Sequence, residues 1–86
     1  MGKTYTAMHD GTVMELRVQD GDYVTRGNVI AKTMWTDEHG RSLTGGTTVS
    51  IKAPIDGRVR IYVMQGGRFH ERQPLFQIIA RGDLDW

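Results

Sequence analysis

The sequence predicts an all-β domain made of two similar halves, and three observations carry this prediction. Apolar residues mostly alternate with polar ones, and no segment keeps a helical period over three turns. Eleven glycines against two prolines indicate many tight turns rather than a flexible linker. Finally, residues 6–18 read TAMHDGTVMELRV and residues 52–63 read KAPIDGRVRIYV, so that an alanine, an Asp-Gly pair and a valine recur at one spacing.

Size and composition restrict the class of protein. An 86-residue chain allows one domain, residues 1–86, close to the lower size at which a hydrophobic core suffices alone. The absence of cysteine excludes disulfides and thiolate metal sites. The net charge is +1 and the basic residues are scattered, so we expect no nucleic acid among the partners. No run approaches the roughly 18 apolar residues of a membrane span, and no signal-peptide core is present, so we expect no direct membrane insertion.

Each repeated stretch should contain one strand. In the second stretch, apolar and polar side chains alternate between two faces. The apolar face holds Val59, Ile61 and Val63, and the polar face holds Arg58, Arg60 and Tyr62. In the first stretch a similar run starts at Val13, and its β-branched residues favour a strand over a helix. Strands should end at the glycine-containing pairs at residues 10–11, 20–21, 26–27, 45–46, 56–57 and 66–67.

The repeat continues beyond these strands. Sliding the chain by the distance from Gly11 to Gly57 pairs several further residues. They are Ala7 with Ala53, Asp10 with Asp56, Val13 with Val59, Gln19 with Gln65, Gly21 with Gly67, Tyr23 with Phe69 and Arg26 with Arg72. Near Asn28 a shift one residue shorter fits better, which predicts a one-residue deletion in a turn of the second copy. Two copies suit two half-barrels, about residues 6–35 and 48–80, which cover each other's apolar faces across a pseudo-twofold axis.

These residues resemble a known family. The stretch DGTVMELRVQDGDYVTRGNVI is similar to the first half of biotinyl and lipoyl carrier domains, and APIDGRVRIYVMQGGRFHERQPLFQI to the second half. The same pattern occurs in the lipoyl-like module of periplasmic adaptor (membrane fusion) proteins. The resemblance covers about residues 6 to 80 and implies the barrel-sandwich hybrid, or hammerhead, fold.

The chain departs from this family at the joint between its halves. In carriers a tight hairpin presents a lysine that bears biotin or lipoate. Here the tip should fall near Asp37, and no lysine occurs between Lys32 and Lys52. The resemblance without that amine implies no prosthetic group and no other cofactor. The alternative is a carrier with a displaced lysine, Lys32, although a solvent-facing strand lysine is the simpler interpretation.

The joint, residues 36–47, is longer than a carrier's hairpin and supplies most of the candidate partner-binding residues. They are Trp35, Asp37, Glu38, His39 and Arg41. Trp35 either closes an open end of the barrel or contacts the partner. Trp86, in the short tail of residues 81–86, is the other candidate, because aromatic residues anchor interfaces.

Catalytic and metal-binding patterns are weak, and we predict neither an enzyme nor a metal site. Asp10 and Asp56 resemble a pair of catalytic carboxylates, but their place before glycine indicates turns. His9 and His70, with Asp10 or Glu71, lack the spacing of zinc ligands.

The sequence therefore favours a non-enzymatic module that binds a protein partner in an assembly. Resemblance to adaptor proteins implies a component of a secretion, efflux or envelope-polysaccharide system. The rival hypothesis is a swinging-arm carrier subunit of a multi-enzyme complex, modified at Lys32. The expected localisation is cytoplasmic if the chain is full length, and periplasmic if it is a domain excised from a larger protein.

Overall fold

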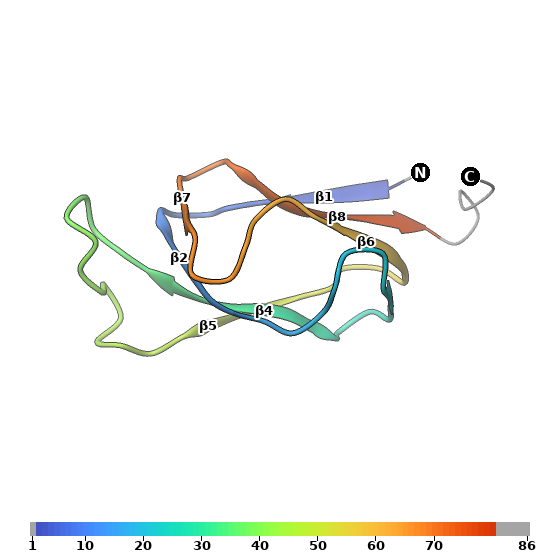
Figure 1. Cartoon of the computed structure of the whole chain (residues 1–86), viewed down its shortest axis with the longest axis horizontal. Helices are drawn as coiled ribbons and strands as arrows, with labels where there is room; N and C mark the ends of the chain where they lie inside the picture. The colour runs from blue at the N-terminus through green and yellow to red at the C-terminus, as the bar shows by residue number, and fades with distance from the viewer. Residues whose placement is uncertain (1, 81–86) are drawn as a thin grey trace.

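Eight short strands account for the regular structure of the chain, which we describe for residues 2–80 of a computed structural model (Figure 1). They are β1 (Gly2–Thr6), β2 (Gly11–Leu16), β3 (Tyr23–Val24), β4 (Val29–Trp35), β5 (Val49–Lys52), β6 (Gly57–Ile61), β7 (Arg68–Phe69) and β8 (Pro74–Ala80). No helix occurs between residues 2 and 80. The all-β prediction is therefore confirmed.

The strands form two antiparallel four-stranded sheets. The first sheet has the order β1-β8-β6-β3 and the second has the order β5-β4-β2-β7. The two orders match position by position, so that each strand of one half takes the place of its counterpart in the other half: β1 matches β5, β8 matches β4, β6 matches β2, and β3 matches β7. Strands β3 and β7 change sides: β3 pairs with β6, and β7 pairs with β2. Each sheet thus contains strands from both halves of the sequence, and neither half forms a sheet of its own.

The long connection between β4 and β5 lies at one end of the molecule, and the start of β1 and the end of β8 lie at the other. Gly2 pairs with Ile79, so β1 begins where β8 ends. Figure 1 shows this end on the right and the β4–β5 connection on the left.

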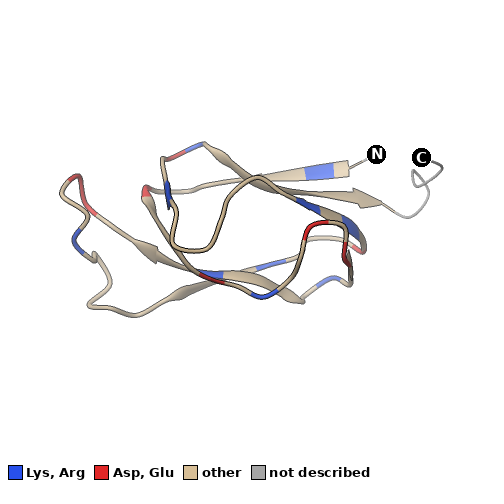
Figure 2. Ribbon diagram, viewed as in Figure 1, with Lys and Arg blue, Asp and Glu red and all other residues tan. Residues whose placement is uncertain are grey.

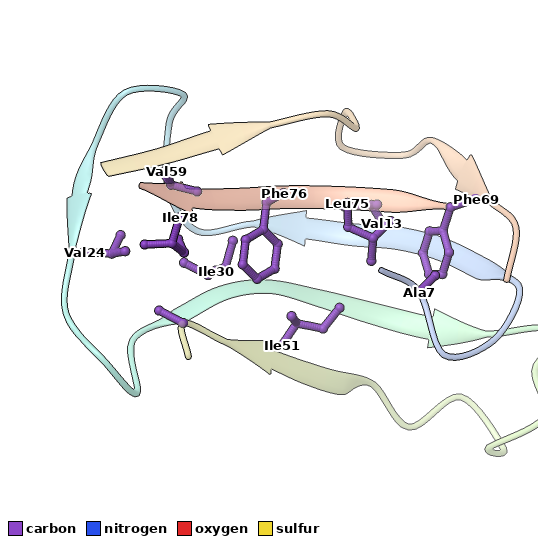
Figure 3. Close-up of a cluster of buried hydrophobic side chains, with 11 residues drawn as sticks. Ala7, Val13, Val24, Ile30, Ile51, Val59, Phe69, Leu75, Phe76 and Ile78 are labelled. Atoms are coloured by element: carbon purple, nitrogen blue, oxygen red, sulfur yellow. The ribbon is translucent and has the colours of Figure 1, made fainter. Parts of the chain in front are cut away.

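The core lies between the two sheets (Figure 3). Its eleven buried residues come from both halves. They are Ala7, Val13, Val24, Ile30, Ile51, Ala53, Val59, Phe69, Leu75, Phe76 and Ile78. The predicted alternation along β6 is confirmed, because Val59 is buried while Arg58 and Arg60 are exposed. Ile61 is half-buried at the edge of this core rather than inside it.

The extra residue of the first half lies in a strand, and the prediction of a deletion in a turn of the second half is wrong. The register of β2 against β4 shifts between Val13 and Glu15, which leaves Met14 as a β-bulge. The register of β6 against β8 runs without a shift. A bulge adds one residue without turning the following side chains to the other face, which explains the odd spacing from Val13 to Leu16.

The position of this bulge corrects the pairing of the turns that follow it. Val59 bonds the backbone of Gly21 and Asp22, and Val13 bonds that of Gly66 and Gly67. Gly21 therefore corresponds to Gly66, not to Gly67.

The other long-shift pairings beyond the bulge are wrong for the same reason. Val24, not Tyr23, is the counterpart of Phe69, because both are buried at the second position of a two-residue strand. Gln19 and Gln65 do not correspond either, because the counterpart of Gln65 is Asp20. The Asp20 carboxylate accepts the N–H of Ile61, and the Gln65 side chain accepts the N–H of Leu16 at the equivalent place in the other half. Arg26 corresponds to Glu71, and Gly27 corresponds to Arg72. Gly27 and Arg72 both have a positive φ, of 92° and 69°.

Two aspartates join the halves. The Oδ1 atom of Asp10 accepts the N–H of Glu71, and that of Asp56 accepts the N–H of Arg26, each at 2.6 Å. Each carboxylate therefore bonds a turn of the opposite half, and the predicted turn role of these residues extends to holding the halves together.

The glycines after these aspartates allow two strands to approach each other closely. A Cβ on Gly11 would lie 2.5 Å from the carbonyl oxygen of Met34 and 2.7 Å from the ring of Phe69. One on Gly57 would collide with the carbonyl of Ile79 in the same way.

Candidate functional site

The connection from residue 36 to residue 48, which we call the joint hairpin, is built as an extension of β4. Thr36 is buried, forms a bridge with Ser42, and donates its N–H to the Asp10 carbonyl at 3.0 Å. Leu43 donates its N–H to the Trp35 carbonyl at 2.9 Å. The base of the hairpin is thus part of the folded sheet.

The tip of the joint hairpin is a turn organised by Asp37. Its Oδ1 atom accepts the N–H groups of His39 at 2.8 Å and of Arg41 at 2.9 Å. Its backbone N–H is bonded to the Arg41 carbonyl at 2.8 Å. The hydrogen bond from the Arg41 N–H is the largest cause that holds the pKa of Asp37 below its ordinary value. The N–H and charge of His39 and the charge of Arg68 lower it further, while partial burial opposes them.

Arg68, on β7 of the other half, lies close to this tip. A Cβ on Gly40 would lie only 3.0 Å from an Nη atom of Arg68, so the guanidinium covers the glycine closely. Gly40 has a positive φ of 81°, which favours glycine at this turn. A side chain from the second half of the chain therefore lies against the tip.

A second turn completes the joint hairpin. The Oγ atom of Ser42 accepts the N–H groups of Gly46 at 2.8 Å and of Thr44 at 3.2 Å. The Oγ1 atom of Thr44 donates to the Thr47 carbonyl at 2.5 Å. Two side-chain caps thus fix the backbone of a connection that contributes no residue to the buried hydrophobic cluster.

The side chains that leave this backbone point outward. Glu38, His39, Arg41 and Leu43 are exposed, and Leu43 exposes 52% of its surface although it is a large apolar residue. The imidazole of His39 lies 3.4 Å from the Glu38 carboxylate. The joint hairpin therefore presents an acid, a histidine, a cation and an apolar side chain on a fixed backbone.

The structure brings five of the six predicted partner-binding residues together but gives them different roles. Glu38, His39 and Arg41 are at the surface, whereas the Asp37 carboxylate is occupied by the hairpin's own amides. Trp35 is half-buried and stacks on His9 with ring centroids 5.7 Å apart. Trp86 lies outside the described residues.

Two residues of the candidate site, Leu43 and Arg68, were not predicted from the sequence. Leu43 carried a usable signal, because it is the one large apolar residue between Trp35 and Val49. Arg68 carried none, because its contact with the tip depends on the pairing of β7 with β2.

Lys32 lies in the middle of β4, away from the hairpin tip. It is half-buried and stands between Glu15 on β2 and Ser50 on β5. Lys52 is exposed, but it pairs with Val29 at the far end of β4 from the hairpin. Neither amine lies in the joint hairpin.

His9 and His70 have different neighbours. His9 stacks on Trp35, and its Nδ1 atom lies 2.9 Å from the Asp10 carbonyl oxygen. The backbone N–H of His70 bonds the Gln73 side chain at 3.1 Å. Among residues 2–80, no three His, Asp or Glu side chains lie together in a way that would hold a metal ion.

No protein-family model and no curated protein matches the chain. In the described part of the chain, no helix has the length and apolar character required to cross a membrane.

Proposed function

We propose that this domain is a non-enzymatic protein-binding module, with the barrel-sandwich hybrid fold of biotinyl and lipoyl carriers but without their lysine chemistry. The chain places two four-stranded sheets in corresponding order, and bonds between the halves recur in pairs. This internal symmetry supports the assignment of the fold. As in the adaptor proteins it resembles, we place the domain in protein assembly, in a secretion, efflux or envelope-polysaccharide system.

The observation that carries the proposal is the construction of the joint hairpin. Its backbone is held by hydrogen bonds to the side chains of Asp37 and Ser42, and Arg68 lies close to Gly40 at its tip, while its outward side chains make no contribution to the core. A loop that is ordered before binding loses less conformational entropy when a partner docks. Arg41 and Leu43 supply the contacts that interfaces favour, a planar cation beside an exposed apolar side chain.

The carrier alternative has weaker support, because Lys32 is half-buried on a sheet rather than presented at a tip. We expect the intact mass to equal that of the unmodified chain after co-expression with biotin and lipoate ligases. An added biotinyl or lipoyl mass would overturn the proposal.

The test of the interface is a comparison of two matched double variants. Arg41→Ala/Leu43→Ala removes a cation and an apolar residue from the joint hairpin, and Arg17→Ala/Met64→Ala removes the same types from other exposed positions. Partners captured from the source organism by the wild-type domain are identified by mass spectrometry and purified, and their affinity is measured by calorimetry. We expect the hairpin variant to lose at least tenfold in affinity and the control variant to bind like wild type. Equal affinity of the two variants would show that the partner does not bind the joint hairpin.

A further inference from the structure

We propose that the groove between the β2–β3 connection and the β6–β7 connection is a second docking site, which binds a partner segment in which a lysine follows two large apolar side chains. This groove, which we call the axial groove, is distinct from the joint hairpin, and we assign it a protein partner of its own. Its assignment does not depend on the function proposed for the hairpin. The evidence is its symmetry, its apolar lining and the position of its charge.

The axial groove lies where the two connections face each other (Figure 1), and its volume is about 570 Å³. Its lining includes three pairs of counterparts from the two halves of the chain. They are Leu16 with Ile61, Val18 with Val63, and Asp20 with Gln65. The groove therefore lies on the pseudo-twofold axis of the domain.

The floor of the axial groove is an accessible edge of the hydrophobic core. Leu16, Val18, Ile61 and Val63 are half-buried and pack against the buried cluster. Met64, which also lines the groove, exposes 73% of its surface. The flexible thioether side chain of methionine adapts to different apolar partners. A concave site of this size, with an apolar lining and few polar groups, has the character of a binding site.

The two walls of the groove are joined across the axis. The Oδ1 atom of Asp20 accepts the N–H of Ile61 at 2.8 Å, and the Oε1 atom of Gln65 accepts the N–H of Leu16 at 3.1 Å. Each connection is thus bonded to the end of a strand in the other half. Walls that are held in this way before a partner docks lose less conformational entropy on binding.

Charge breaks the symmetry of the axial groove. Among the described residues that line it, Asp20 is charged and its counterpart Gln65 is neutral. Figure 2 shows acidic residues, Asp20 and Asp22, on the β2–β3 connection and none on the β6–β7 connection. A carboxylate accepts several hydrogen bonds, so Asp20 can bind an ammonium group while it also holds the N–H of Ile61.

Neighbouring arginines leave this carboxylate unneutralised. The guanidinium of Arg17 pairs with the Glu15 carboxylate at 3.2 Å. Alternation along β6 turns Arg58 and Arg60 to the outer face of the sheet, away from the groove. Within residues 2–80, Asp20 forms no ion pair with a lysine or arginine. The groove therefore complements a segment that carries a cation at one end of an apolar stretch.

The same features set the direction of the bound segment. One apolar side chain of the segment can lie against Leu16 and the next against Ile61, while its lysine reaches Asp20. Because the apolar floor is nearly the same in both directions, the charge at one end decides which way the segment lies.

Short peptides test the binding. ¹H–¹⁵N spectra of the full chain are recorded during titration with acetyl-Gly-Leu-Leu-Lys-amide, with a second peptide that has glutamine in place of lysine, and with a third that has two alanines in place of the leucines. Amide shifts should move at Leu16, Ile61 and Gly66. The glutamine peptide should bind about threefold more weakly, as expected for an exposed ion pair, and the alanine peptide at least tenfold more weakly. Equal binding of the lysine and glutamine peptides would overturn the proposal.

Single variants locate the site. Met64→Ala should weaken binding at least threefold, whereas Met8→Ala, which removes a methionine with 69% exposure outside the groove, should bind like wild type. Asp20→Asn keeps an oxygen that accepts the N–H of Ile61 but removes the charge, so it should bind the lysine and glutamine peptides equally. A preference for lysine that persisted in Asp20→Asn would show that the cation binds elsewhere, and the proposal would be wrong.

A charge exchange tests the direction. Asp20→Asn/Gln65→Glu moves the carboxylate to the other end of the groove without changing the net charge, and both new side chains keep an oxygen acceptor. A nitroxide at the N-terminal end of the lysine peptide should broaden the Gly66 amide in wild type and the Gly21 amide in the exchanged variant. The same broadening pattern in both proteins would refute the role of Asp20 in setting the direction.

Two other occupants are distinguished by separate measurements. If wild type and Met8→Glu sedimented as dimers and Met64→Glu as a monomer, a second copy of the chain would occupy the groove, and the proposed partner would be wrong. Hexylammonium that bound more tightly than the lysine peptide would replace the partner segment with a small amphiphilic cation.

Discussion

Replacing Asp10 and Asp56 with alanine should weaken the attachment of each half of the domain to the other. Each carboxylate accepts one backbone N–H from a turn of the opposite half, at 2.6 Å. Alanine removes the acceptor, and the amides of Glu71 and Arg26 must then find water. The two sites are equivalent in the fold, so they provide two measurements of one interaction.

The expected size follows from the hydrogen bond and its surroundings. A hydrogen bond to a charged group contributes about 1.5–3 kcal/mol. Asp10 is half-buried and should come near the low end of that range, about 1.5 kcal/mol, whereas the exposed Asp56 should contribute about 1 kcal/mol. The double variant should therefore lose about 2.5 kcal/mol from a domain of this length that is stable by about 4–13 kcal/mol.

Urea unfolding followed by circular dichroism measures these losses. At about 4–8 °C per kcal/mol, the double variant should also melt roughly 10–20 °C below wild type. Asp→Asn variants keep an oxygen acceptor and should recover part of the loss, while Glu38→Ala, at the exposed hairpin tip, should change little. A double variant within about 0.5 kcal/mol of wild type would refute the idea that these aspartates hold the halves together.

Three further predictions concern the bulge, the core edge and the hairpin tip. Deleting Met14 should leave a folded domain, because β2 would then match β6 residue for residue, whereas deleting Arg60 should unfold it by turning Ile61 outward. Similar melting curves for the two deletions would contradict this account. Ile61→Ala should cost about 1–2 kcal/mol in urea unfolding, below the roughly 2–5 of a fully buried isoleucine, and Arg60→Ala should cost less than Ile61→Ala. The reverse order would show that the facing of β6 is wrong. The pKa of Asp37 is lowered in the fold, so its stabilisation of the hairpin tip is complete above its unfolded pKa and is lost as pH falls through the lower folded value. Amide exchange at His39 and Arg41 should accelerate across that acidic range, and an Asp37→Asn variant should not show this pH dependence.

Much of the fold follows from short-range patterns in the sequence. The alternation around Val59 and the glycine-containing turns depend on local chemistry, so they were predictable. The register of the repeat was not, because the identical pairs of Gln19 with Gln65 and Gly21 with Gly67 favour the longer shift. Backbone hydrogen bonds decide against that shift, and residue identity does not reveal them.

The candidate site shows the same division. The polar tip around Asp37 was predictable from the missing lysine and the length of the joint. The contact of Arg68 with the tip was not, because it joins residues far apart in the sequence through the β2–β7 pairing. Contacts of this kind depend on the tertiary fold and have no local pattern.

Because β3 and β7 each pair with a strand of the other half, the joint hairpin also keeps the two halves of the chain together. Because each sheet needs strands from both halves, two separate half-chains would assemble only as a dimer, at a rate and stability that depend on protein concentration. The covalent connection replaces that dependence with an effective concentration in the millimolar range, typical of a short linker. A protease cut after Gly45 should thus leave two fragments that stay associated when concentrated and separate on dilution.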